Sequence, residues 1–181
     1  MPSFVFCSIA AVAAVSTGAT SFAACWQPES VHAAEVRDFD TMLMVGALRC
    51  RADPDSYLER YNAFVTASRG ALAEANQGLR NHFEDAVGNV AALAEYDRYI
   101  VKVANRYGAG SDDLNCRDLG SLVDAAMAEG ASFSTLVAFA ELAAADPLLD
   151  DERCVVEIAD AAPREAAHEQ TIMAALADPS I

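Results

Sequence analysis

Two short motifs in this sequence have the residue types and the spacing of metal ligands. Glu29 precedes His32 by three positions, and Glu165 precedes His168 in the same way. On a helix such a pair shares one face, and two Glu-x-x-His motifs with two further glutamates form the di-iron site of ferritin-like bundles. In those bundles the ligands project inward from long helices, whereas Glu29 lies in the first turn of its expected helix and Glu165 in the weakest element. A metal–carboxylate site on these four residues is therefore an alternative hypothesis, and we predict no cofactor.

The sequence lacks the short motifs that identify common enzyme classes. The patterns Gly-x-Gly-x-x-Gly, Gly-x-x-x-x-Gly-Lys-Ser/Thr, His-Glu-x-x-His and Gly-x-Ser-x-Gly are absent, so dinucleotide, nucleotide, zinc-protease and serine-hydrolase chemistry lose their usual support. The 27 acidic residues leave a pair of carboxylates available for glycoside hydrolysis, which keeps a small helical hydrolase as an alternative. The third histidine, His82, is expected at a helix surface or in a cap region.

The charge balance argues against binding to nucleic acid. The chain carries 12 Lys+Arg and 27 Asp+Glu among 181 residues, a formal net charge of −15. Phosphate recognition requires clustered basic side chains, which this composition does not supply. A strongly acidic surface favours solubility, and it also attracts cations. An acidic partner of a cationic envelope protein is therefore a further alternative.

Residues 1–23 have the features of a signal peptide. They contain no charged side chain, and the apolar run from Phe4 to Val15 is too short to span a bilayer. Small residues follow, and Ser21-Phe22-Ala23 fits the small-x-small pattern at which such leaders are cut. We expect cleavage after Ala23 and a periplasmic or secreted mature chain without a membrane span.

Four cysteines remain once the leader and its Cys7 are removed, and they predict two disulfides in an exported protein. Cys25 and Cys50 flank one expected helix of about 30 Å, so they should not pair, because the Cα atoms of a disulfide lie within about 7 Å. Two arrangements remain. We prefer Cys25 with Cys154 and Cys50 with Cys116 over Cys25 with Cys116 and Cys50 with Cys154. In an up-down bundle the end of the first helix and the start of the fourth lie together.

A lipoprotein signal is the alternative at the cleavage site. The stretch from Phe22 to Cys25 resembles a lipobox, in which Cys25 would become the lipidated first residue. Lipidation would leave an odd number of three cysteines for disulfide formation. The cysteine count therefore favours an ordinary cleaved leader.

The composition of the mature chain favours an all-α fold. Alanine makes up about a fifth of the sequence, with only 9 Gly and 6 Pro. We predict a disulfide-stapled bundle of about five helices over residues 24–154. The first helix spans 28–51 and repeats apolar residues at spacings of three and four. Because 42–48 is apolar on every side, we expect this helix to be central and buried all round, with Gly46 admitting a close neighbour.

Turn residues divide the rest of the domain. The second helix follows Pro54, with Asp53 or Asp55 as its cap, and is expected to end at Gly78. Residues 79–108 form the next helical segment, interrupted at Gly88.

Two more helices and a tail complete the prediction. The fourth helix follows an acidic stretch with Asn115 and Asp118, which we interpret as a cap and not as a calcium loop, since it lacks the EF-hand spacing. The fifth helix begins at a cap on Ser132 or Ser134. Residues 155–181 are predicted to be an acidic, alanine-rich tail, weakly helical or partly disordered.

Several blocks of the domain resemble a known group of proteins. They are Cys25-Trp26 with residues 33–51, residues 61–64, residues 96–99 and residues 104–108. Together these blocks look like a small exported helical family of sphingomonad-type proteobacteria, over residues 25–154. The resemblance implies export and a cysteine framework. The resemblance implies no particular activity, so no functional residue is assigned from it.

These observations predict an exported, non-enzymatic helical protein with a binding or cell-envelope role. Its partner is unidentified, and a protein of the envelope is the candidate. The metal–carboxylate protein, the small helical hydrolase and the acidic partner of a cationic protein are the alternatives. We assign no catalytic or cofactor-binding residue.

Overall fold

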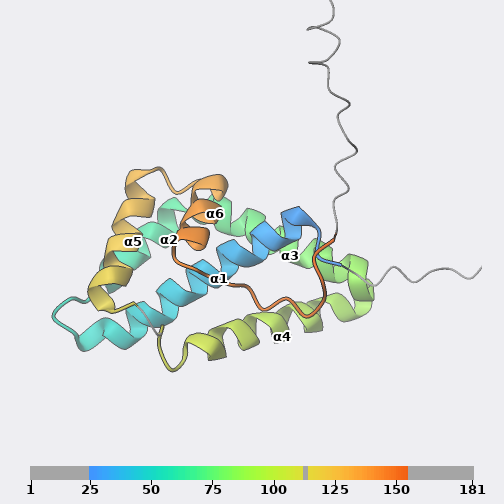
Figure 1. Ribbon diagram of the computed structural model, residues 1–181, viewed down its shortest axis with the longest axis horizontal. Coiled ribbons are helices and arrows are strands. Elements are labelled where there is room, and N and C mark those ends of the chain that lie inside the picture. Colours follow the sequence, from blue (N-terminus) through green and yellow to red (C-terminus); the bar gives the residue numbers. More distant parts are fainter. Residues whose placement is uncertain (1–24, 112–113, 155–181) are drawn as a thin grey trace, which may run out of the picture.

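The computed structural model describes residues 25–111 and 114–154. Within these ranges the chain is all-α, with no strand, which confirms the predicted fold class. The elements are α1 (Pro28–Arg49), the 3-10 helix η1 (Cys50–Ala52), α2 (Leu58–Ala67), α3 (Arg69–Val87), α4 (Asn89–Tyr107), α5 (Cys116–Ala128) and α6 (Phe133–Leu142) (Figure 1). The predicted leader and tail lie outside the described residues.

Helix α1 runs through the middle of the bundle and contacts each of the other five α-helices (Figure 1). Its predicted apolar face is buried throughout, at Val36, Phe39, Leu43, Ala47 and Cys50. Helices α3 and α4 pack side by side as a hairpin along α1. The central position predicted for this helix is therefore confirmed.

The prediction that α1 is buried all round is wrong at its end. Leu48 exposes 54% of its surface, and Met44 and Val45 are only partly buried. Two carboxylates in the first half, Asp38 and Asp40, are instead buried. Tyr61 of α2 and Tyr107 of α4 reach these two carboxylates, so contacts with other helices decide burial here and not the polarity of the residue.

The boundary between the second and third helices differs from the prediction. Helices α2 and α3 meet at Ser68, and Gly78 lies inside α3. A Cβ atom at Gly78 would lie 2.8 Å from the Cβ of Ala33, so this glycine lets α3 approach α1 closely. The predicted break at Gly88 is confirmed, with a φ of 77° that favours glycine. Breaks at Ser68 and Gly88 account for six α-helices in place of about five.

The predicted helix caps are partly confirmed. Asn115 and Asp118 form a capping box at the start of α5, and the Ser132 hydroxyl accepts a hydrogen bond from Thr135 N at the start of α6. Neither Asp53 nor Asp55 caps α2, which begins without a side-chain cap. Asp53 instead accepts a hydrogen bond from the backbone of Asp55, because the chain turns once more before the helix starts.

Both preferred disulfides are present. The Cα atoms lie 4.9 Å apart in Cys25–Cys154 and 5.8 Å apart in Cys50–Cys116. The sulfur of Cys25 is therefore engaged, which contradicts a thioether-linked lipid at this position. Disulfides are typical of proteins oxidised outside the cytoplasm. No helix within the described ranges combines the length and apolar character needed to cross a membrane.

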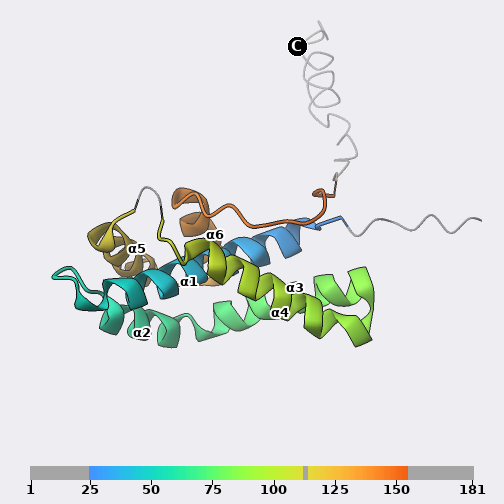
Figure 2. The same cartoon turned by 90° about the horizontal axis from the view of Figure 1, so that it is seen from below.

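Residues 143–154, which we call the C-terminal segment, run back along the bundle on the side opposite α2 and α3 (Figure 2). Lys102 and Arg106 of α4 hold it through the Asp150 carboxylate and the Asp146 carbonyl. At its end, Trp26 N donates to Glu152 O and Cys154 N donates to Trp26 O, both at 2.9 Å. The segment thus closes the bundle over the start of α1.

Candidate functional site

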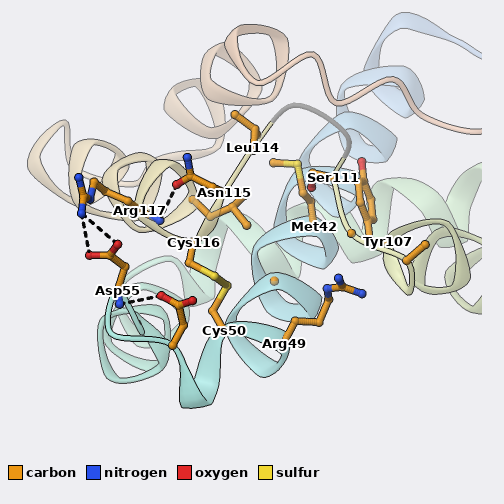
Figure 3. A pocket seen from close by; sticks show the side chains of 15 residues that line it. Met42, Arg49, Cys50, Asp55, Tyr107, Ser111, Leu114, Asn115, Cys116 and Arg117 are labelled. Carbon is orange, nitrogen blue, oxygen red and sulfur yellow. Dashed lines mark hydrogen bonds and ion pairs between the residues drawn. A yellow bond between two sulfur atoms is a disulfide. The ribbon is translucent and has the colours of Figure 1, made fainter.

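A pocket of about 580 Å³ lies where the ends of α1 and α4 meet the start of α5 (Figure 3). We call it the α1–α4–α5 pocket. Its apolar lining includes Met42, Leu114 and Leu119, and the Cys50–Cys116 disulfide forms part of its wall. Its volume falls within the range of about 300–1,000 Å³ that is typical of small-molecule sites.

Local packing around Gly46 shapes this pocket. A Cβ atom at this position would lie 2.6 Å from Cδ1 of Leu119 and closer still to the Tyr57 hydroxyl. That hydroxyl donates a hydrogen bond to the Leu43 carbonyl at 3.0 Å. Glycine therefore lets α2 and α5 pack directly against α1, as the sequence predicted for this position. The Cys50–Cys116 disulfide holds the same helix ends together.

Charged side chains of both signs lie around the pocket. Arg117 and Asp55 form an exposed ion pair with an N–O distance of 3.1 Å. Arg49 donates to the Gly108 carbonyl at 2.6 Å, and Asp53 accepts from a backbone N–H. Among the described residues, neither Arg49 nor Asp53 forms an ion pair. The pocket thus offers cationic and anionic contacts to a ligand.

Tyr107 connects this pocket to a buried carboxylate. Its hydroxyl donates to Oδ2 of Asp38 at 2.6 Å, and the guanidinium of Arg106 lies 3.6 Å from Oδ1 of the same residue. Asp38 is fully buried, and this burial raises its pKa to about 6, although Tyr107 and Arg106 act in the opposite direction. The carboxylate contributes to the core beneath the pocket.

Asp40, on the same helix, has its own partners. Its carboxylate accepts from Arg37 at 2.5 Å and from the Tyr61 hydroxyl at 3.0 Å. Burial nevertheless raises the pKa of Asp40. No local sequence signal marks either carboxylate as buried, because the tyrosines that pair with them come from α2 and α4.

Only two of the four predicted metal ligands lie within the residues that the structure describes. Glu29 and His32 are both exposed at the start of α1, and Glu165 and His168 lie outside the described residues. Over residues 25–111 and 114–154, no three His, Cys, Asp or Glu side chains gather in a way that could hold a metal ion. The described part of the chain therefore brings no third ligand to Glu29 and His32.

The surface position predicted for His82 is wrong. The residue is buried and stacks on Trp26, with the ring centroids 3.7 Å apart. Burial lowers the pKa of His82 and favours its neutral form. The Cys25–Cys154 disulfide holds Trp26 at this end of the bundle, and no local sequence signal reveals that placement.

No family model, curated protein or solved structure matches this chain. The resemblance to the sphingomonad-type family stays a prediction. Function must therefore be argued from the geometry of the molecule itself.

Proposed function

We propose that this chain is an exported, non-enzymatic helical domain that binds a small amphipathic ligand in the α1–α4–α5 pocket. One observation carries the proposal: a pocket of about 580 Å³ combines an apolar lining with side chains of both charges. A few polar groups around an apolar cavity are the usual composition of a small-molecule site.

The arrangement of the charges suggests how a ligand would lie. Arg49 lies on one side of the Cys50–Cys116 disulfide, and Asp55 with Arg117 on the other (Figure 3). An anionic group would be placed at Arg49, whose guanidinium uses one nitrogen for the Gly108 carbonyl and keeps other donors. The apolar part of the ligand would contact Met42 and the disulfide.

The side chains that line this pocket support binding more than catalysis. Its described lining contains no histidine, and both of its cysteines are oxidised. A hydroxyl or thiol nucleophile needs an adjacent general base, or a lowered pKa, to be activated. The described lining offers the hydroxyl groups of Ser111 and Tyr107 without an imidazole beside them, and the Tyr107 hydroxyl already donates to Asp38.

The location of the protein follows from separate features. The leader predicted over residues 1–23 and the two disulfides support folding in an oxidising compartment. We propose a periplasmic or secreted protein, with a mature chain that begins at Ala24. Intact-mass measurement of the exported protein gives this end directly.

The ligand proposal is tested by titrating the oxidised protein with anilinonaphthalene sulfonate, an amphipathic anion whose fluorescence rises in apolar surroundings. Ala109→Phe fills the pocket with a large side chain and should weaken binding about tenfold or more, equivalent to about 1.4 kcal/mol. Ala94→Phe, at an exposed position of α4 outside the pocket, is the matched control and should leave binding unchanged.

Two results would contradict the proposal. One is equal affinity of the dye for the Ala109→Phe variant and the unchanged protein. The other is the failure of a low-molecular-weight extract, taken from the compartment to which the protein is exported, to displace dye from the pocket. A displacing fraction leads to the ligand, which mass spectrometry then identifies.

A further inference from the structure

A second hollow, of about 240 Å³, lies beside the Cys25–Cys154 disulfide. The start of α1, helix α6 and the C-terminal segment surround it. Its lining includes Trp26, Val31, His32, Glu35, Glu141 and Arg153. It shares no lining residue with the α1–α4–α5 pocket, so it is a separate site.

Glu35 is the unusual side chain in this hollow. It exposes only 8% of its surface, and its Oε2 atom is buried without a hydrogen-bond partner among the described residues. Its Oε1 atom lies 3.9 Å from the Arg153 guanidinium, which is itself largely exposed. A buried carboxylate with one unpaired oxygen is costly, so a small rotation of this side chain toward a hydrogen-bond donor in the hollow would be favourable.

The charges that face Glu35 leave the hollow negative. His32 faces it from α1, Glu141 from α6, and Asp146 and Arg153 from the C-terminal segment. Two lining carboxylates, Glu35 and Glu141, therefore accompany one guanidinium, and Asp146 adds a third negative charge from outside the lining. Burial raises the pKa of Glu35, while His32 and Arg153 oppose this rise. A positively charged group in the hollow would offset the charge of Glu35 and reduce the repulsion between the carboxylates.

The shape and chemistry of the hollow select the kind of cation. A metal ion needs several protein ligands, and the described residues provide no cluster of three. An alkylammonium group carries three N–H donors and needs only one or two carboxylates. Trp26 and Val31 offer apolar surface to the adjoining methylene groups. At about 240 Å³ the hollow suits a head group better than a whole drug-sized ligand.

We propose that this hollow binds a primary alkylammonium group, with Glu35 as its buried counter-ion and Glu141 as a second carboxylate. The site is independent of the ligand proposed for the α1–α4–α5 pocket. The ammonium group belongs either to a free polyamine or to a lysine side chain. Both sources share the same recognition chemistry.

Trp26 provides the readout, because it is the single tryptophan of the chain and lines the hollow. The oxidised protein is titrated with butylammonium chloride at neutral pH, against sodium chloride at the same ionic strength. Tryptophan fluorescence and calorimetry are recorded together. Saturable binding is expected in butylammonium alone. Tetramethylammonium, which cannot donate hydrogen bonds, should bind about tenfold more weakly or worse.

Three variants sharpen the test. Glu35→Gln removes the buried charge with little change of shape and should weaken binding about tenfold or more. Arg153→Gln removes the competing guanidinium and should strengthen binding. Glu29→Gln, an exposed position on the same helix that does not line the hollow, is the control and should change nothing.

The absence of saturable binding in both fluorescence and calorimetry would overturn the proposal, as would equal affinity of Glu35→Gln and the unchanged protein. A thermal melt checks the fold of each variant. If Glu35→Gln does not fold, Arg153→Gln decides, because unchanged affinity in that variant contradicts the role of Glu35. The affinities of cadaverine and of a lysine-containing peptide are then compared. The tighter binder shows whether the ammonium group belongs to a free polyamine or to a lysine side chain.

Discussion

The first half of α1, residues 28–40, contains Glu35, Arg37, Asp38 and Asp40 and is nevertheless enclosed by other elements over most of its surface. The second half, residues 41–49, is mostly apolar but has Leu48 on the surface. The contacts of α1 explain the contrast. Phe39 meets aromatic rings from α2 and α6, and the C-terminal segment covers the side that carries Glu35. Burial along this helix thus follows the contacts made by other elements, and not local hydrophobicity.

The two halves also differ in what holds them together. The first half is a polar core, in which tyrosine hydroxyls and arginines reach Asp38 and Asp40, and the Cys25–Cys154 disulfide closes the chain over it. The second half ends in the Cys50–Cys116 disulfide and an open pocket. This division gives each disulfide a different task, so the two halves should respond differently to mutation.

Removal of the disulfides should have the largest effect on stability. Each typically contributes about 2–5 kcal/mol, and the loop-entropy account predicts about 5 kcal/mol for Cys25–Cys154 and about 4 kcal/mol for Cys50–Cys116. The reason is their sequence separations of 129 and 66 residues. Urea denaturation of Cys25→Ser/Cys154→Ser and Cys50→Ser/Cys116→Ser measures both losses.

Trp26 emission from the folded variants gives a second readout. It should change when Cys25–Cys154 is removed, because the residue next to the bond is then less tightly held, and should stay unchanged without Cys50–Cys116. The opposite order of stability losses, or equal emission from both variants, would contradict the separate tasks of the disulfides.

Two leucines of α1 test the difference in burial directly. Leu43 is fully buried and Leu48 is mostly exposed. Leu43→Ala should lower the free energy of unfolding by about 2–5 kcal/mol, because it leaves a cavity in the core. Leu48→Ala removes the same atoms from the surface and should change that free energy by no more than about 0.5 kcal/mol. Chemical denaturation measures both, and equal losses would show that another element covers Leu48 in solution.

The buried carboxyl of Asp38 should make stability depend on pH. Its pKa is raised from 3.8 to about 6 in the folded chain, so the folded state binds more protons than the unfolded state between these values. Stability from this group is complete below pH 3.8 and is lost as pH rises through about 6, a change of up to about 3 kcal/mol. Glu35 and Asp40, whose pKa values are also raised, act in the same direction.

Denaturation of Asp38→Asn over this pH range should give a flatter dependence than the unchanged protein. Tyr107→Phe is the complementary variant. It removes the hydrogen bond that holds the pKa of Asp38 down, so it should extend the loss of stability to higher pH. Identical pH profiles for Asp38→Asn and the unchanged protein would assign the dependence to other groups.

Several features of the fold could be predicted because their signals are local. The apolar spacing in α1, the break at Gly88 and the cap at Ser132 each depend on neighbours along the chain. The disulfide pairing depends on two further features: Cys25 and Cys50 lie at opposite ends of one helix, and in an up-down bundle the end of the first predicted helix lies beside the start of the fourth. For the candidate site, the sequence indicated that Gly46 admits a close neighbour and that Cys50 pairs with Cys116, but it gave no sign of the pocket between them.

The predictions that proved wrong share one cause, which is contact between parts of the chain that are distant in sequence. Gly78 was expected to end a helix, but it lies inside α3, where its missing side chain leaves room for Ala33 of α1. His82 was expected at the surface, but it is buried because Trp26 stacks on it. The pocket also escaped prediction, since its lining comes from two stretches that lie far apart in the sequence, residues 42–55 and 107–119.

The sequence by itself determined the all-α class, the central helix and the two disulfides, because helical periodicity and cysteine number act at short range or by simple geometry. Only the tertiary structure decided which acids of α1 are buried and where cavities remain. A carboxylate such as Asp38 can be buried where a hydroxyl and a guanidinium reach it, and these partners lie on α4, far along the chain.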